Sequence, residues 1–121
     1  MSLCILAAGK MTVLAATAFT LSWTHSIEKT RWEEDWRVAA SGLEVVEARV
    51  KGSGAGIDPP EGAVLKDGWW VYTPAIPPRQ SVSLAASGAT GSGWRLCADG
   101  DCMEFGGEAG EAIELSVCDA N

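Results

Sequence analysis

The chain has few of the residues from which catalytic and metal sites are usually built. Its 121 residues include one histidine, His25, and four cysteines. A zinc site would need His25 with several cysteines, yet only Cys97 and Cys102 are closely spaced. No Gly-x-Ser-x-Gly motif is present, which argues against a serine hydrolase with a nucleophile elbow. We therefore assign no catalytic residue and expect neither a metal nor another cofactor.

Basic residues are also scarce. Nine lysines and arginines stand against sixteen acidic residues, for a formal net charge of −7, and none of the basic residues follows Arg95. A chain of this charge is repelled by nucleic acid and by anionic membrane surfaces. We expect neither as a partner, and the sequence indicates no particular oligomeric state.

No apolar run is suited to cross a membrane. Residues 3–23 are mostly apolar, and Ala16-Thr17-Ala18 is similar to a signal-peptidase site. However, Lys10 interrupts the run and no basic segment precedes it. We expect no membrane insertion and, by default, a cytoplasmic location, with a periplasmic location as the alternative. Strands over 3–8 and 11–26, joined by a turn at Gly9-Lys10, account better for this run.

Short alternating segments separated by turn residues make up the rest of the chain. None has helical periodicity, which is typical of an all-β protein. The sequence predicts a single domain over 1–121, an antiparallel β-sandwich or a partly open barrel of short strands. The further strands are expected at 43–50, 64–66, 69–73, 81–86, 94–97, 102–105 and 113–118.

Residues 19–38 form the most informative segment, because apolar and polar side chains alternate on both sides of a polar turn. A turn at 27–30 would place Ser26 opposite Arg31. The expected cross-strand pairs are then Phe19 with Val38, Leu21 with Trp36, Trp23 with Glu34, and His25 with Trp32. One face of this hairpin is apolar except for His25 and Glu34, which lie diagonally within side-chain reach.

The His25–Glu34 pair has two interpretations. As a desolvated acid/base pair it is typical of a tuned site, because burial and an adjacent imidazolium shift a carboxyl pKa in opposite directions. As a structural hydrogen bond it would satisfy two polar groups among the tryptophans. We expect the pair to shape a polar notch beside Trp23 and Trp32. Ser26 adjoins this notch, and the loop 54–60, with Gly54 and Gly56, is expected to form its rim.

The cysteines predict disulfides. A hairpin about Asp99-Gly100 places Cys97 directly opposite Cys102, which suits a cross-strand bond. Cys4 and Cys118 lie in the first and last expected strands, which can pair edge to edge. A bond between them is our hypothesis for the second disulfide, although four cysteines allow three connectivities.

Several motifs together resemble the bacterial family called domain of unknown function 1850. The first is His25-Ser26-Ile27-Glu28-Lys29-Thr30, followed by Trp32, Glu34 and Trp36. The others are Gly52-Ser53-Gly54-Ala55-Gly56, Gly68-Trp69-Trp70 and Leu96-Cys97-x4-Cys102. The resemblance covers nearly the whole chain and implies a small β-rich domain. Genes of this family are often found beside tripartite ATP-independent periplasmic (TRAP) transporters of the TAXI type, which implies an accessory role in solute uptake.

These observations favour a non-enzymatic accessory or binding domain of a TAXI-type transport system. Its expected partner is a transporter component or the transported solute. One alternative is a small enzyme that uses His25 and Glu34 for acid/base chemistry. A thiol redox switch at Cys97 and Cys102 is the other.

Overall fold

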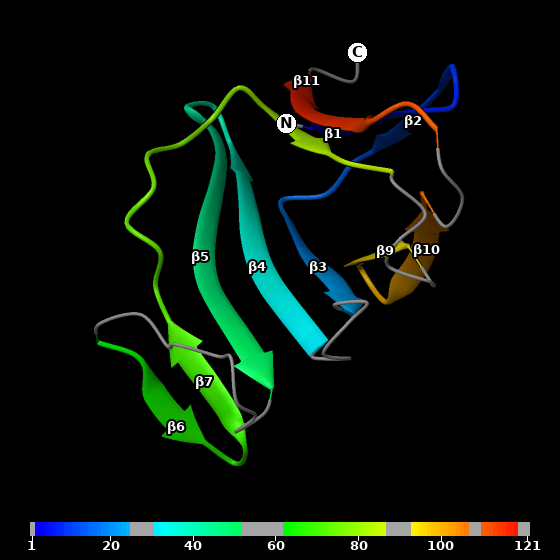
Figure 1. The fold of residues 1–121 in the computed structure, drawn as a ribbon. Coiled ribbons are helices and arrows are strands. Elements are labelled where there is room, and N and C mark those ends of the chain that lie inside the picture. Colours follow the sequence, from blue (N-terminus) through cyan, green and yellow to red (C-terminus); the bar gives the residue numbers. More distant parts are fainter. Residues whose placement is uncertain (1, 25–30, 52–61, 87–92, 107–109, 119–121) are drawn as a thin grey trace.

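The computed structural model describes residues 2–24, 31–51, 62–86, 93–106 and 110–118. Its regular structure in these ranges consists of β-strands in two antiparallel sheets (Figure 1). The short sheet has the order β2-β1-β11-β8, and the long sheet has the order β10-β9-β3-β4-β5-β7-β6. The strands are β1 (Ser2–Ala7), β2 (Lys10–Leu14), β3 (Ala18–Thr24), β4 (Arg31–Ala39), β5 (Gly42–Lys51), β6 (Val64–Lys66), β7 (Trp69–Tyr72), β8 (Ser81–Leu84), β9 (Trp94–Ala98), β10 (Asp101–Phe105) and β11 (Ile113–Cys118). The predicted all-β class is confirmed, and the two sheets form a sandwich-like fold that does not close into a barrel.

The core lies between the short sheet and one end of the long sheet. Alternate residues of each strand point inward, so each sheet contributes one apolar face. A fully buried side chain of this kind stabilises the fold by about 1.5–3 kcal/mol. The short sheet contributes Leu3, Ile5, Leu84, Ile113 and Leu115, and the long sheet contributes Phe19, Leu21, Trp36, Val38, Leu43, Val45 and Leu96.

The single strand predicted over 11–26 is wrong, because the chain turns a corner within it. β2 ends at Leu14 in the short sheet, and β3 begins at Ala18 in the long sheet. At the corner the Ala16 N–H donates to the Leu14 carbonyl at 2.9 Å, and the Val38 N–H donates to the Thr17 carbonyl at 2.8 Å. Apolar residues continue through this corner because both strands face the same core, so the sequence pattern does not show the break.

The predicted register of β3 with β4 is also wrong, by two residues. Phe19 lies opposite Trp36 and not Val38, and Trp23 lies opposite Trp32 and not Glu34. A shift of two residues keeps every side chain on its predicted face. The observed register stacks aromatic pairs across the strands, with ring centroids 6.1 Å apart for Phe19–Trp36 and 6.0 Å apart for Trp23–Trp32. These contacts give a physical reason for the observed register.

The long sheet extends well beyond the region that the short sheet covers. In Figure 1 the short sheet lies at the top, whereas β6 and β7 lie at the bottom left, beyond the lower end of β5. A β-bulge helps to bend β5 away: Val45 pairs with Trp36 and Glu47 pairs with Asp35, which leaves Val46 between them. The inward face of the long sheet therefore has a second part outside the main core.

Candidate functional site

The predicted notch is only partly within the described residues. Trp23, Trp32 and Glu34 are described, and all three lie on the inward face of the long sheet, as expected. His25, Ser26, Gly54 and Gly56 lie outside the described residues. The His25–Glu34 pair therefore stays a prediction.

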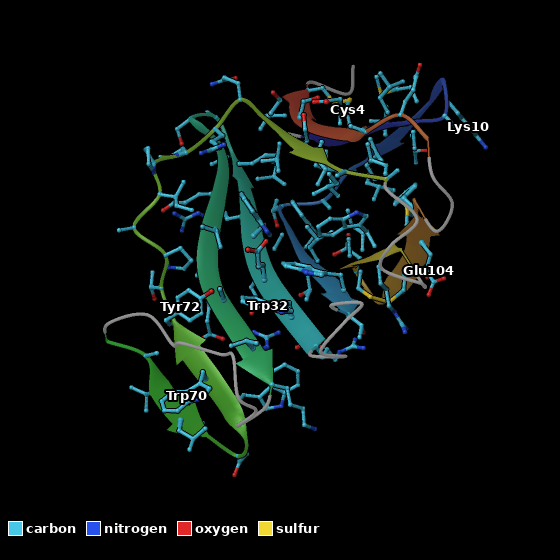
Figure 2. The ribbon with its side chains drawn as sticks, in the orientation of Figure 1. Cys4, Lys10, Trp32, Trp70, Tyr72 and Glu104 are labelled. Carbon is cyan, nitrogen blue, oxygen red and sulfur yellow. A yellow bond between two sulfur atoms is a disulfide. The ribbon has the colours of Figure 1, made fainter. Side chains whose placement is uncertain are left out.

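Two rows of cross-strand neighbours define the surface around Glu34. Glu34 lies opposite Ala48, which lies opposite Tyr72; one step along the strands, Trp32 lies opposite Val50, which lies opposite Trp70. Directly opposed residues share a face, so these side chains all lie on the inward side. We call Trp23, Trp32, Glu34, Trp70 and Tyr72 the aromatic face. Figure 2 labels three of these residues, Trp32, Trp70 and Tyr72, at the end of the molecule away from Cys4 and Lys10.

Small residues form the floor of the aromatic face. Ala48 and Val50 are each 1% exposed, whereas Trp32, Glu34 and Tyr72 keep intermediate exposure. Strands two apart in a sheet are separated by about 10 Å. The short side chain of Ala48 therefore leaves room for Glu34 and Tyr72 to approach each other above it. This arrangement creates a half-buried surface that can contact a small molecule or a partner.

The tryptophans of this region pack against one another. Trp23 stacks on Trp32 with an angle of 7° between the rings, and Trp94 packs against Trp23 at 4.8 Å between centroids, tilted by 49°. Trp94 also donates its indole N–H to the Ala85 carbonyl at 2.9 Å. By contrast, the indole N–H of Trp32 is buried and has no hydrogen-bond partner among the described residues. Burying a donor in this way costs about 1–3 kcal/mol.

Glu34 is a carboxylate in largely aromatic surroundings. Its Oε1 accepts a hydrogen bond of 3.1 Å from the indole N–H of Trp36. Burial raises the pKa of Glu34, and the hydrogen bond from Trp36 offsets only part of this effect. Burial also raises the pKa of Tyr72, and the negative charge of Glu34 adds to that shift. No ion pair involves Glu34 within the part of the chain that the structure describes.

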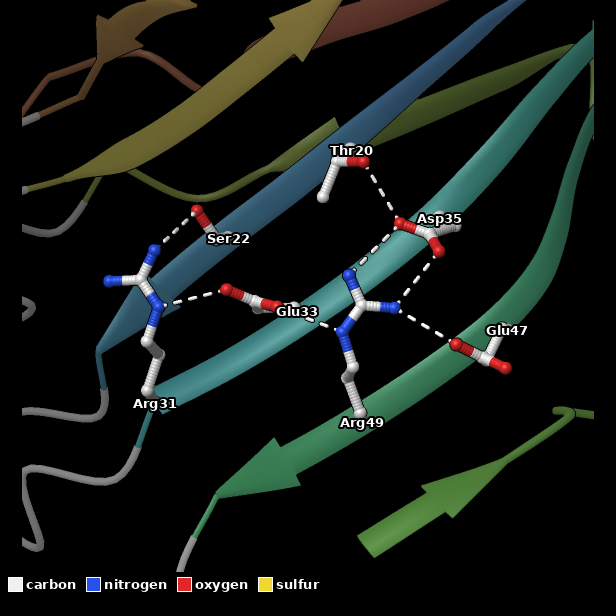
Figure 3. A network of polar contacts seen from close by, with 7 residues as sticks. All are labelled: Thr20, Ser22, Arg31, Glu33, Asp35, Glu47 and Arg49. Carbon is white, nitrogen blue, oxygen red and sulfur yellow. Dashed lines mark hydrogen bonds and ion pairs between the residues drawn. The ribbon is translucent and has the colours of Figure 1, made fainter. Parts of the chain in front are cut away.

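The neighbouring acidic residues on the opposite, outward face have a different environment. Arg49 contacts Glu33 at 2.8 Å, Asp35 at 2.9 and 3.2 Å, and Glu47 at 3.0 Å (Figure 3). Hydrogen bonds from Arg49 lower the pKa of Asp35. Burial alone would raise the pKa of Glu33, but its hydrogen bonds with Arg31 and Arg49 outweigh burial and lower it. Glu33 and Asp35 therefore have arginine partners, whereas no arginine among the described residues pairs with Glu34.

The outward face also carries an open groove with a volume of about 760 Å³. Thr20, Asp35, Arg37 and Val46 line one part of it, and Cys97 lines another. Asp35 is already bonded to Arg49 and Thr20, and Arg37 pairs with Glu44. These polar groups already have partners, so the groove presents fewer unused interactions than the aromatic face.

Both predicted disulfides are present. Cys97 lies opposite Cys102 across a tight turn in which Asp99 and Gly100 have φ of 51° and 84°, as expected for a two-residue hairpin loop. We call this bond the hairpin disulfide. Cys4 and Cys118 join β1 to β11, with Cα atoms 5.9 Å apart, and we call this bond the terminal disulfide.

The disulfides also bear on metal binding. All four cysteines are bonded in pairs, so none has a thiolate available as a ligand. No group of three His, Cys, Asp or Glu residues is arranged to hold a metal ion in the described ranges.

Sequence reasoning missed the position of Trp70 and Tyr72 beside Glu34. Alternation places the two residues on one face of β7, and the Asp67-Gly68 turn predicts the hairpin of β6 and β7. Neither signal identifies β5 as the partner strand of β7 or shows which face of that hairpin points inward. The pairing of Ala48 with Tyr72 supplies this information.

Comparisons with known proteins identify the family. No curated protein and no solved structure shows significant similarity. Among the described residues, no helix is long and apolar enough to cross a membrane. The family model described as "Domain of unknown function (DUF1850)" matches residues 19–105, which is more than half of the chain and includes every residue of the aromatic face. The chain therefore belongs to the DUF1850 family.

Proposed function

We propose that this protein is a non-enzymatic binding domain that serves as an accessory of a TAXI-type TRAP transport system. The observation that carries the binding role is the aromatic face, where the Glu34 carboxylate lies among half-buried aromatic rings and forms no ion pair with a described residue. Binding sites typically combine apolar and aromatic walls with a few polar groups that orient the ligand. The link to a transporter depends on the family resemblance.

The disulfides support an extracytoplasmic location for this role. Structural disulfides persist mainly in oxidising compartments such as the bacterial periplasm. Both pairs in this chain join neighbouring antiparallel strands. We therefore favour the periplasmic alternative over the cytoplasmic location expected by default from the sequence.

A pull-down with the components of a TAXI-type TRAP transporter from the same organism tests the accessory role. The protein is expected to retain a transporter component, and the solute of that system is expected to raise its melting temperature. Trp70→Ala is expected to weaken these effects. Trp69→Ala is the matched control, because Trp69 precedes Trp70 in the same strand and points to the opposite face. On that face the Lys51 Nζ lies 5.5 Å from the centroid of the Trp69 ring. Failure of both assays with the wild-type protein would refute the proposal.

A redox function is the second candidate, and one observation favours it. Cys102 is exposed, and Cys97 lines the groove on the outward face, so the hairpin disulfide is accessible to a thiol. If it is a switch, a mild thiol reductant should release two thiols while the fold and the terminal disulfide persist. Thiol alkylation followed by intact-mass measurement would detect this, and release of no thiol or of all four would contradict it.

A further inference from the structure

We propose that the aromatic face binds an organic cation, a small molecule that carries a quaternary or protonated ammonium group. This inference rests on the proposed binding function and specifies its ligand class. It starts from the juxtaposition of the Glu34 carboxylate with Trp32, Trp70 and Tyr72 over the floor of Ala48 and Val50.

The charge of the inward face favours a cationic ligand. Among the described residues of β3, β4, β5 and β7, Glu34 is the only charged side chain on the inward face. Glu33 and Asp35 have arginine partners on the outward face, whereas Glu34 accepts a hydrogen bond from Trp36 and forms no ion pair with any described residue. A bound cation would supply an opposite charge, in surroundings where ionic attraction is stronger than in water. The formal net charge of −7 also favours the approach of cations.

The aromatic rings of this face also favour a cationic ligand. The faces of tryptophan and tyrosine rings attract cations, and tryptophan is the strongest of the aromatic side chains. Trp32 and Trp70 lie on either side of Val50, and Tyr72 lies across Ala48 from Glu34. A compact ammonium group placed above this floor can contact rings and carboxylate together. Clusters of aromatic rings are a known means of recognising quaternary ammonium groups.

Other ligand classes fit this face less well. An anionic ligand would approach Glu34 with an unfavourable charge. A neutral sugar can stack on tryptophan but offers no opposite charge to Glu34. The charge of this face thus favours a cation.

Choline and its uncharged isostere 3,3-dimethyl-1-butanol form the test on the wild-type protein. The two probes have nearly the same shape and differ in charge, so their affinities isolate the cationic contribution. Isothermal titration calorimetry of the full chain should show saturable choline binding, with the isostere weaker by about tenfold, the size expected of a partly desolvated cation–π contact. No saturable choline binding, or equal affinity for the isostere, would overturn the inference.

Variants separate the two parts of the site. Glu34→Gln keeps the shape and the acceptor for Trp36 but removes the charge, and the lost Coulombic attraction should weaken choline binding by about fivefold to tenfold. Trp70→Ala should weaken it similarly, whereas Trp69→Ala on the outward face should leave it unchanged. Thermal unfolding checks that each variant is folded. Choline affinity that is unchanged in Glu34→Gln, or lowered equally by Trp69→Ala, would contradict the proposed site.

The outcomes also distinguish this inference from the proposed function. If the transporter component is retained and choline does not bind, the accessory role stands and the cation inference is wrong. If methyl glucoside binds the aromatic face and choline does not, the binding role stands with a neutral ligand, and the cation inference is again wrong.

Discussion

Replacing Arg49 by methionine should reveal how much the outward ion network stabilises the fold. Methionine keeps the length and apolar character of the side chain but removes the guanidinium. In the wild-type protein this group bridges two strands, since it binds Glu33 and Asp35 of β4 from its place in β5 and also contacts Glu47 (Figure 3). The substitution leaves Asp35 and Glu47 without an arginine partner in the network, while Glu33 keeps only its contact with Arg31.

The expected loss of stability follows from the exposure of these groups. The side chains of Arg49 and Glu33 are 21% and 19% exposed, whereas that of Asp35 is 39% exposed. Exposed pairs contribute about 0.2–1 kcal/mol each. The two bonds to Asp35 and the half-buried bond to Glu33 lie at the upper end of that range. After allowance for solvent screening, Arg49→Met should lower the free energy of unfolding by about 2 kcal/mol and the melting temperature by about 5–10 °C.

The loss of stability in Arg49→Met should become smaller as the pH falls. Hydrogen bonds with Arg49 help to lower the pKa of Glu33 and of Asp35 below their ordinary values of 4.5 and 3.8. A carboxyl group whose pKa is lowered on folding contributes stability above its unfolded pKa and loses that contribution as pH falls through its folded pKa. The gap between wild type and Arg49→Met should therefore be full near neutral pH and should narrow below about pH 4.

Chemical denaturation at about pH 7 and about pH 2.5 measures this gap directly. The control is Arg37→Met, which removes the pair with Glu44; those side chains are 57% and 34% exposed, so the expected cost is below about 0.5 kcal/mol. Equal losses for the two variants, or a gap for Arg49→Met that stays the same at low pH, would refute this account of the network.

Three further predictions concern the disulfides, the aromatic face and one turn. Replacing both cysteines of the terminal disulfide by serine should lower the free energy of unfolding by about 5 kcal/mol, because the bonded residues are 114 positions apart. The same change in the hairpin disulfide should lower it by about 2 kcal/mol, because those residues are only 5 positions apart. Chemical denaturation of both variants tests this order. Glu34→Gln should be more stable than wild type near neutral pH, because burial raises the pKa of Glu34, and the difference should vanish in unfolding measurements as falling pH protonates the carboxyl group. Gly42→Ala should cost more than about 2 kcal/mol in thermal unfolding, because φ is +130° and the new Cβ would lie 2.5 Å from the Arg79 carbonyl oxygen.

Each of these predictions has an outcome that contradicts it. A larger loss for the hairpin disulfide than for the terminal one would rule out the loop-length explanation. A Glu34→Gln variant less stable than wild type near neutral pH would show that the charge of Glu34 is compensated. For the turn, Gly9→Ala is the control, since Gly9 has φ of +77° with no atom near the added Cβ. It should cost about 1 kcal/mol, because an L-residue is strained in the left-handed region, and an equal cost at Gly42 would mean that the contact with Arg79 is not limiting.

Local signals made the strands and the tight hairpins predictable. The turns at Asp67-Gly68 and Asp99-Gly100 place two residues in the left-handed region, which aspartate and glycine adopt readily. A two-residue loop determines the register of its strands, so the pairing of Cys97 with Cys102 followed directly from the sequence. The hairpin of β1 and β2 has the same kind of turn, but at Ala8-Gly9 and not at the expected Gly9-Lys10.

The sequence did not determine the register of β3 with β4. Alternation with a period of two assigns faces, but it is unchanged by a shift of two residues. The sequence between Thr24 and Arg31 contains no two-residue turn motif that would specify which residues pair. The choice between the two registers depends on contacts that act after the chain has turned, among them the stacking of Trp23 on Trp32.

The sequence by itself determined most of the strands, the faces of the hairpins, the hairpin disulfide and the position of Glu34 on an apolar face. Each of these properties depends on side-chain alternation or on the backbone preferences of a few adjacent residues. Only the tertiary structure decided the order of the strands, the corner between β2 and β3, and the proximity of Glu34 to Tyr72. These features join residues far apart in the chain, and their stability comes from packing between whole sheets, which no local pattern encodes.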